Sequence, residues 1–350
     1  MPFQVVPATG AVLHQVLDDT FQLWSDGLSR ENYGKVWAAQ LKTPWGSGHL
    51  DRVALVDGPH VVSSAKRYDL SLRLDGRNRR CVGIGAVFTA PAYRGRGGAR
   101  ELVTRILEAA VAEGQEFAML FSEIAPAFYE RLEFVPVPLA EWTIEVDQKR
   151  GGAPAMLVRS GDNRDLHNIA EMSAARAAQA RLALDRSEDF IKFGVSRKRL
   201  LSGFSPPATR ETEFLVVEEG HQAVAYLVCT SIDGRWIIEE AGDRDPTGAR
   251  LGAMLQVMLA RNPGERLPEI RAWWPHGLVP PQLRVAASTS TQEVLMIRPL
   301  KDRMLPLPPL AAAEVAGCDR AADESSTLPA SASRPRPSPA AARARAATSI

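Results

Sequence analysis

The chain has 350 residues, of which 45% are hydrophobic and 24% are charged, and its formal net charge is +1 at pH 7. This composition is typical of a soluble globular protein that is long enough for two domains. A net charge so close to zero argues against nucleic acid or an anionic membrane as the main partner.

Signals for targeting, membranes and metals are missing from the sequence. The N-terminus has no basic region followed by an apolar core, and no apolar run approaches the roughly 20 residues of a membrane span. We therefore expect a cytoplasmic protein with no membrane partner. Three cysteines, Cys81, Cys229 and Cys318, and six histidines are too scattered for a metal site, and the cysteines form no disulfide framework.

Residues 1–147 are expected to form one α/β domain. Apolar spacing predicts a strand at 3–6, helices at 12–28 and 30–41, strands at 52–56, 60–74 and 80–89, a helix at 101–112, a strand at 117–122, a short helix at 126–132, and strands at 134–137 and 142–146. This order favours a mixed sheet flanked by helices. Trp24, Trp37 and Trp45 lie on or near the early helices, where they could contact a cationic acceptor or simply fill the core.

Residues 154–300 repeat this pattern of elements without repeating the sequence, after a linker at 147–153. The predicted elements are a strand at 155–158, a helix at 165–182, strands at 214–218, 222–230 and 235–241, a helix at 248–259, and strands at 269–274 and 293–298. Residues 301–350 are rich in Pro and Ala, and we expect them to form a disordered tail.

The most informative segment is Gly83–Ala99, where an apolar strand leads into a glycine-rich loop and then into a helix. The loop reads Arg94, Gly95, Arg96, Gly97, Gly98, Ala99. Its glycines let backbone N–H groups approach an anion, and the helix N-terminus adds the positive end of its dipole. The two arginines can neutralise phosphate. The pattern predicts a site for a phosphorylated cofactor; a turn that glycine merely stabilises is the alternative.

The loop resembles the acetyl-CoA motif of the GCN5-related N-acetyltransferase (GNAT) family, which reads Arg or Gln, two residues, Gly, one residue, and Gly or Ala. A second family signature follows at Phe121–Phe134, where a strand leads into a short helix that carries Phe128 and Tyr129. The family mostly has Gly at the position of Glu133, so we expect strain in that turn. Residues 154–300 resemble the degenerate second domain of tandem acetyltransferases of the enhanced-intracellular-survival type.

This resemblance implies the acyl-CoA N-acyltransferase fold, present as two GNAT-like domains in tandem. It implies an enzyme that transfers the acetyl group of acetyl-CoA to a primary amine of a small molecule or a lysine side chain, by direct attack in a ternary complex. The corresponding loop of the second domain contains Asp243 and Asp245, which would repel phosphate, so we expect no cofactor there. Neither nucleic acid nor a metal is implied, and a homo-oligomer is left open.

The resemblance also implies roles for residues near the loop. Val87, Phe88 and Thr89 would present backbone groups to the pantetheine arm, and an N–H near Phe88 would stabilise the oxyanion. Ser122 would contact the arm or the thioester, or would only cap the end of a strand. Together with the loop residues 94–99, these form the expected cofactor-binding set.

Two residues are candidates for proton transfer. Tyr129 matches the family's proton donor to the departing thiolate, since a phenol with a pKa of about 10 is protonated at neutral pH; the alternative is a tyrosine that packs in the core. Glu123 is the best-placed carboxylate for a general base, although a solvated charge at the end of a strand is also expected there. The sequence does not identify the base.

Two other functions compete with the enzyme. A non-catalytic acyl-CoA-binding sensor or scaffold would need residues 94–99 but would have no use for the hydroxyl of Tyr129. A nucleotide-binding loop is disfavoured, because no Lys-Ser or Lys-Thr pair follows the glycines.

Overall fold

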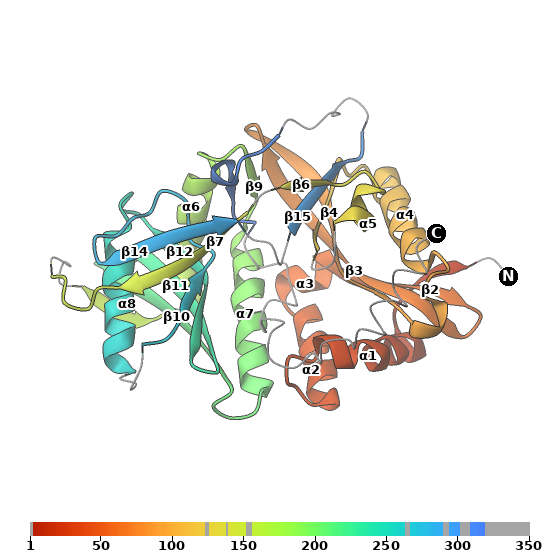
Figure 1. The fold of residues 1–350 in the computed structure, drawn as a ribbon, viewed down its shortest axis with the longest axis horizontal. Coiled ribbons are helices and arrows are strands. Elements are labelled where there is room, and N and C mark those ends of the chain that lie inside the picture. Colours follow the sequence, from red (N-terminus) through yellow and green to blue (C-terminus); the bar gives the residue numbers. More distant parts are fainter. Residues whose placement is uncertain are drawn as a thin grey trace, which may run out of the picture.

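A computed structural model describes residues 3–122, 126–137, 139–151, 156–262, 267–289, 294–301 and 309–318 (Figure 1). Its helices are α1 (Gly10–Trp24), α2 (Arg30–Leu41), α3 (Pro44–His49), α4 (Gly98–Ala112), α5 (Ala127–Glu130), α6 (Leu166–Ala177), α7 (Glu188–Phe204) and α8 (Ala249–Arg261). Short 3₁₀ turns are η1 (Pro91–Tyr93), η2 (Asn163–Asp165) and η4 (Ala312–Glu314). No helix of the described residues has the length and apolar character needed to cross a membrane.

The strands form two mixed sheets. The first follows the order β1 (Gln4–Pro7), β2 (Leu50–Asp57), β3 (His60–Leu74), β4 (Arg77–Thr89), β5 (Phe117–Ser122), β15 (Val294–Pro299), β6 (Val135–Val137). Two short strands extend this sheet: β9 (Leu182–Leu184) pairs with β3, and β16 (Val315–Ala316) pairs with β9. The second follows the order β8 (Leu157–Ser160), β10 (Arg210–Glu219), β11 (Gln222–Ile232), β12 (Arg235–Asp243), β13 (Ile270–Ala272), β7 (Ala140–Val146), β14 (Leu283–Thr289). The expected α/β class, with mixed sheets flanked by helices, is confirmed.

The two sheets share one plan and exchange one strand. In each, the fourth and fifth strands of the order run parallel, and the sixth strand comes from the other half of the chain (Figure 1). Strand β7 places Ile144 in the core of the second sheet, whereas β15 places Leu295 and Ile297 in the core of the first. The division between the sheets therefore does not fall at residues 147–154, where we expected the domains to meet.

Helix α7 stands between the two halves (Figure 1). It packs against α2 and α3 on one side and against α6 and β10 on the other. The rings of Phe190 and Phe193 meet Trp45 of α3 at centroid distances of 4.7 and 4.8 Å. Such aromatic contacts in a buried core make the two halves one packed unit.

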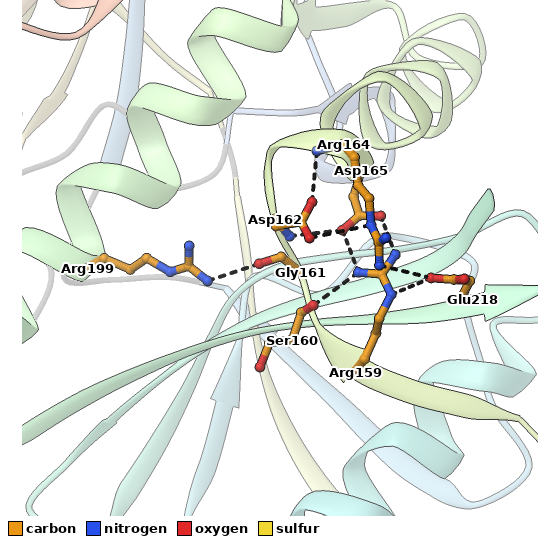
Figure 2. A network of polar contacts seen from close by, with 8 residues as sticks. All are labelled: Arg159, Ser160, Gly161, Asp162, Arg164, Asp165, Arg199 and Glu218. Atoms are coloured by element: carbon orange, nitrogen blue, oxygen red, sulfur yellow. Dashed lines mark hydrogen bonds and ion pairs between the residues drawn. The ribbon is translucent and has the colours of Figure 1, made fainter. Parts of the chain in front are cut away.

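A polar network holds the turn from β8 into α6 (Figure 2). Arg159 binds the carboxylate of Asp165 through two hydrogen bonds of 2.7 and 2.8 Å and also pairs with Glu218. The guanidinium of Arg199, from α7, donates to the carbonyl of Gly161 at 3.2 Å. Burial raises the pKa of Asp165, but hydrogen bonds from Arg159 and from the Asp162 backbone outweigh it and leave that pKa below its ordinary value.

Several elements differ from the sequence-based expectations. Helix α7 and strand β9 lie in a stretch for which no element was predicted, and the predicted helix at 165–182 ends at Ala177. Residues 309–318 belong to the fold, because β16 pairs with β9 and the side chains of Leu310 and Cys318 are buried. The expectation of disorder from residue 301 onward is therefore wrong for this segment. Residues 319–350 lie outside the described residues.

Candidate functional site

Strands β4 and β5 separate at the point where the sequence predicts the site. Their parallel ladder runs from Cys81 and Phe117 to Ile84 and Leu120 and then stops. Just beyond it, β4 bulges, since Ala86 and Val87 together lie opposite the single residue Ala65 of β3. Ala86 has a φ of +49°, which costs an alanine about 1 kcal/mol. The bulge turns Val87–Thr89 away from β5 and leaves the facing edges of the two strands unpaired there.

The glycine loop joins this bulge to helix α4. Gly97 is the N-cap of α4 with a φ of +80°, and Gly95 has a φ of +75°. A Cβ on Gly98 would lie 2.9 Å from Val62, so this glycine lets the start of the helix sit against β3. The first N–H groups of a helix have no partner within it and can therefore bind an anion.

The two loop arginines are exposed beside these N–H groups. Arg94 donates from Nε to the carbonyl of Thr89 at 3.3 Å, and the guanidinium carbon of Arg96 lies 5.7 Å from the centre of the Tyr93 ring. Thr89 is fixed in turn by a hydrogen bond of 2.9 Å between its hydroxyl and that of Ser63. The structure thus brings residues 87–89 and 94–99 together in one continuous cradle.

Tyr129 lies on the same face of the sheet as α4. Its ring packs edge-on against Phe128 and Phe134, at centroid distances of 4.9 and 6.0 Å, and belongs to the core beneath α4. Burial raises the pKa of Tyr129 to about 12. The hydroxyl is therefore protonated at neutral pH, as a proton donor requires. The packing of the ring is compatible with a structural role as well.

The remaining predicted site residues are Ser122, at the end of β5, and Glu123. Ser122 is buried and pairs in register with Val294 of β15. Glu123 falls outside the described residues, so its role as a base stays a prediction. Glu133 has a φ of +61°, which confirms the expected strain in that turn, and Arg298 of β15 forms an ion pair with it.

The corresponding loop of the second half has the same backbone plan with different chemistry. Gly248 is the N-cap of α8 with a φ of +70°. Here, however, the carboxylate of Asp243 accepts the backbone N–H of Arg250 at 3.0 Å and that of Asp245 at 2.9 Å. Asp245 accepts from the backbone and hydroxyl of Thr247. The chain's own carboxylates thus take donors that a phosphate would use.

A small cavity lies on the opposite face of the first sheet from α4. It has a volume of about 30 Å³ and is lined by Leu17, Trp24, Asp26, Tyr33, Val36, Trp37, Gln40, Arg52, Lys66, Arg197 and Leu201. Trp24 packs edge-on against Phe88 with a centroid distance of 6.3 Å, so the cavity adjoins the bulged part of β4. Two of its residues, Arg197 and Leu201, come from α7.

The three early tryptophans have different surroundings. Trp24 and Trp37 line the small cavity, whereas Trp45 is packed in the core against Phe190 and Phe193. The ring of Trp37 is already covered by two cations of the protein, because Arg52 and Lys66 each lie 4.7 Å from its centre. A cationic acceptor would therefore have to compete with these two side chains for the ring of Trp37.

Sequence reasoning missed the charged residues of this cavity. Arg52 and Lys66 lie in predicted strands beside other charged residues, Asp51 and Arg67, so the local sequence did not mark them as buried. Arg197 could not be found, since helix α7 itself was not predicted. Among the described residues, no group of three or more His, Cys, Asp or Glu is placed to hold a metal ion.

Residues 14–137 match the family model described as an acetyltransferase (GNAT) domain. No curated protein sequence matches the chain.

Solved structures share the fold over most of the chain. A probable N-acyltransferase from Enterococcus faecalis has 13% sequence identity and a TM-score of 0.62, with 85% of this chain and 72% of that chain covered. A GCN5-related N-acetyltransferase from Kribbella flavida has 18% identity and a TM-score of 0.60, with coverage of 85% and 71%. Eis1 from Mycobacterium abscessus has 14% identity and a TM-score of 0.52, with coverage of 86% and 74%. At these identities the similarity establishes the fold.

Proposed function

The chain carries an acetyltransferase domain of the GNAT family at residues 14–137, and on that premise we propose that it transfers an acetyl group from acetyl-CoA to a primary amine. The acceptor is a small molecule or a lysine side chain. The first half carries the chemistry, and the second half is a degenerate GNAT-like domain that shapes the acceptor side. Helix α7 supports this division, because Arg197 and Leu201 reach the cavity beside Phe88.

The observation that carries the proposal is the separation of β4 and β5 beside a glycine loop. The ladder ends at Ile84 and Leu120, and helix α4 begins at Gly98 immediately after the loop. An extended pantetheine arm can add to the free edge of Val87–Thr89 as another strand would. The N–H groups of the loop and the side chains of Arg94 and Arg96 would then bind the pyrophosphate.

The reaction requires three contributions from the chain. The amine nitrogen attacks the thioester carbon, and the backbone N–H near Phe88 stabilises the oxyanion that forms. The C–S bond then breaks, the thiolate takes the hydroxyl proton of Tyr129, and the nitrogen loses its proton to solvent or to a base. Glu123 is the candidate for that base. Ser122, at the end of β5, would contact the arm or the thioester.

Release of free CoA thiol from acetyl-CoA with a panel of primary amines tests this proposal. We expect at least one amine to accelerate thiol release and to become N-acetylated in equal amount, as mass spectrometry would show. If acetyl-CoA binds but no amine accelerates its consumption, the chain is a non-catalytic acyl-CoA-binding protein instead. Acetyl-CoA that fails to bind at all would refute both functions.

A further inference from the structure

The parallel strands of the second sheet separate in the same way as those of the first. Their ladder ends at Ile238 of β12 and Ala272 of β13. Strand β12 bulges directly beyond this point, because Glu239 is an extra residue between Ile238 and Glu240, which pair with the consecutive residues Cys229 and Val228 of β11. The end of β12 and the segment that follows β13 then form two walls of one cleft.

This cleft is large enough for a small organic ligand. It has a volume of about 1020 Å³, and its other walls come from α6, from the start of β7 and from residues 312–318. Beside the bulge of β4, by contrast, the ring of Phe88 packs against Trp24. In the second half, Ala241 and Gly242 lie at this place, and much of the surface that α6 adds consists of alanine. Small side chains thus keep the space between the walls open.

Aromatic side chains are concentrated in the lining of the cleft. Three of the seven tryptophans of the chain lie there together with a tyrosine and a histidine, namely Trp142, Trp273, Trp274, Tyr226 and His276. Trp142 and Trp273 are only half-buried, and the rings of Trp142 and His276 meet edge-on at a centroid distance of 6.1 Å. Several rings around a concave site favour a ligand that is itself planar and aromatic.

The charged side chains of the lining are bound to other groups of the chain. Three of them belong to ion pairs, which are Arg244 with Glu171, Asp243 with Arg250, and Arg186 with Glu240. Arg176 donates to the carbonyl of Ala241 at 3.3 Å. A charged ligand would lose its hydration on entering the cleft and would have to compete with these contacts, whereas an uncharged ligand leaves them in place.

The start of α8 distinguishes this cleft from an acyl-CoA site. The carboxylate of Asp243 lines the cleft and accepts the backbone N–H groups of Asp245 and Arg250, at 2.9 and 3.0 Å. A phosphate at this helix N-terminus would need such donors and would be repelled by the carboxylate. The second half therefore combines an opening between strands with aromatic walls and with a helix start that disfavours anions.

We propose that this cleft is a second ligand site of the chain, which binds an uncharged, planar aromatic molecule. The site goes beyond the proposed acetyl transfer and does not depend on it, since neither acyl-CoA nor an amine takes part in the binding. Its aromatic walls select the ring, its paired charges favour a neutral ligand, and its volume accepts molecules larger than a single ring.

Four small probes test the site and the class of ligand. They are indole, its anionic relative indole-3-acetate, its cationic relative tryptamine, and the non-aromatic cyclohexanol. Titration of the full chain, followed by saturation-transfer NMR of the probe, gives the Kd of each. We expect indole to bind at least about fivefold more tightly than the other three probes, and saturating acetyl-CoA to change its Kd less than twofold.

Three results of this titration would overturn the proposal. Equal affinities for indole and cyclohexanol would contradict recognition of an aromatic ring. Tighter binding of indole-3-acetate or tryptamine would show a site for a charged ligand. Displacement of indole by acetyl-CoA would place the probe in the first half. A chain that binds indole but not acetyl-CoA would keep this site while the proposed function fails.

A variant that fills the cleft links the binding to this place. Ala175 of α6 is exposed and lines the cleft, so Ala175→Phe should raise the Kd for indole at least about tenfold. Ala260→Phe is the matched control, because Ala260 is an exposed alanine near the end of α8 outside the lining, and its Kd should stay within twofold. If Ala175→Phe does not fold, Ala174→Phe fills the cleft from the neighbouring position. Equal Kd values in the filled and control variants would contradict a site in this cleft.

Discussion

Gly97 and Gly248 occupy the same place in the two halves of the chain. Each is the N-cap of the helix that follows the fourth strand of its sheet, with φ values of +80° and +70°. After Gly248, the N–H of Arg250 is bound by the carboxylate of Asp243, whereas the loop before Gly97 presents two exposed arginines. The two halves thus share one backbone plan, but among the described residues carboxylates of the chain bind the start of the helix only in the second half.

Charge reversal in the first loop should weaken binding of acetyl-CoA. We expect Arg96→Glu to raise its Kd about 10- to 100-fold, because one attractive contact to phosphate becomes a repulsive one. Isothermal titration calorimetry measures the Kd. Arg244→Glu, the same reversal in the second loop, is the control and should leave the Kd within twofold. If the two variants raised the Kd equally, the pyrophosphate could not be assigned to the first loop.

The two N-cap glycines should respond differently to alanine. Gly97→Ala meets no atom within 4 Å of its new Cβ, so it should cost only the backbone strain of about 1 kcal/mol and should weaken acetyl-CoA binding. Gly248→Ala brings its Cβ within 3.2 Å of Leu278, so it should lower the free energy of unfolding further without changing the Kd. Urea denaturation and calorimetry together check this, and a larger loss of affinity in Gly248→Ala would be inconsistent with it.

Removal of the Tyr129 hydroxyl should slow the reaction but not weaken binding. A general acid contributes about 10²-fold or more, so Tyr129→Phe should lower kcat by that order while the Kd for acetyl-CoA is unchanged. Tyr93→Phe removes a hydroxyl near the loop arginines and serves as the control with normal kcat. An unchanged kcat in Tyr129→Phe would show that Tyr129 is not the proton donor and has only a packing role in the core.

The raised pKa of Tyr129 gives a pH dependence with a definite sign. Burial raises this pKa to about 12, whereas an unfolded tyrosine titrates at about 10. The neutral hydroxyl therefore stabilises the native state below pH 10, and this contribution is lost as the pH rises toward 12. We expect wild-type stability to fall more steeply than that of Tyr129→Phe above pH 10, and kcat to show no loss from tyrosine ionisation between pH 7 and 10. Parallel stability curves would contradict the burial of a neutral phenol.

The network around Asp165 should stabilise the second half at neutral pH. Asp165→Asn removes a carboxylate that accepts two hydrogen bonds from Arg159, so we expect a loss of about 2 kcal/mol. Because the native pKa of Asp165 is lowered, its contribution is present above about pH 4 and disappears as the pH falls through the native pKa. The difference between wild type and variant in urea denaturation should therefore shrink at low pH. A difference independent of pH would show that the charge is not responsible.

The strands β1 to β5 and the passage from strand through glycine loop to helix at Gly83–Ala112 were predictable from the sequence, because their signals are local. A continuous apolar run predicts strand β5, and three glycines next to two arginines predict the loop. The exchange of β7 and β15 was not predictable in this way, since a strand's period shows which face is buried but not which strand lies beside it.

The missed parts of the site have a common cause. Helix α7 is buried against both halves, so Arg197 and Lys198 lie inside the protein, where an amphipathic pattern would place them in water. Ser187, which caps this helix by accepting the N–H of Phe190, was its clearest signal. The cavity beside Phe88 requires α7 in position, and a single sequence does not reveal that contact.

We expect the two similar halves of the chain to bind acyl-CoA once, in the first half. Calorimetric titration of the full chain with acetyl-CoA tests this most directly through the stoichiometry. We predict one acetyl-CoA per chain, with binding strongly weakened by Arg96→Glu and unaffected by Arg244→Glu. Two molecules bound per chain, or one that Arg244→Glu displaces, would contradict a single site in the first half.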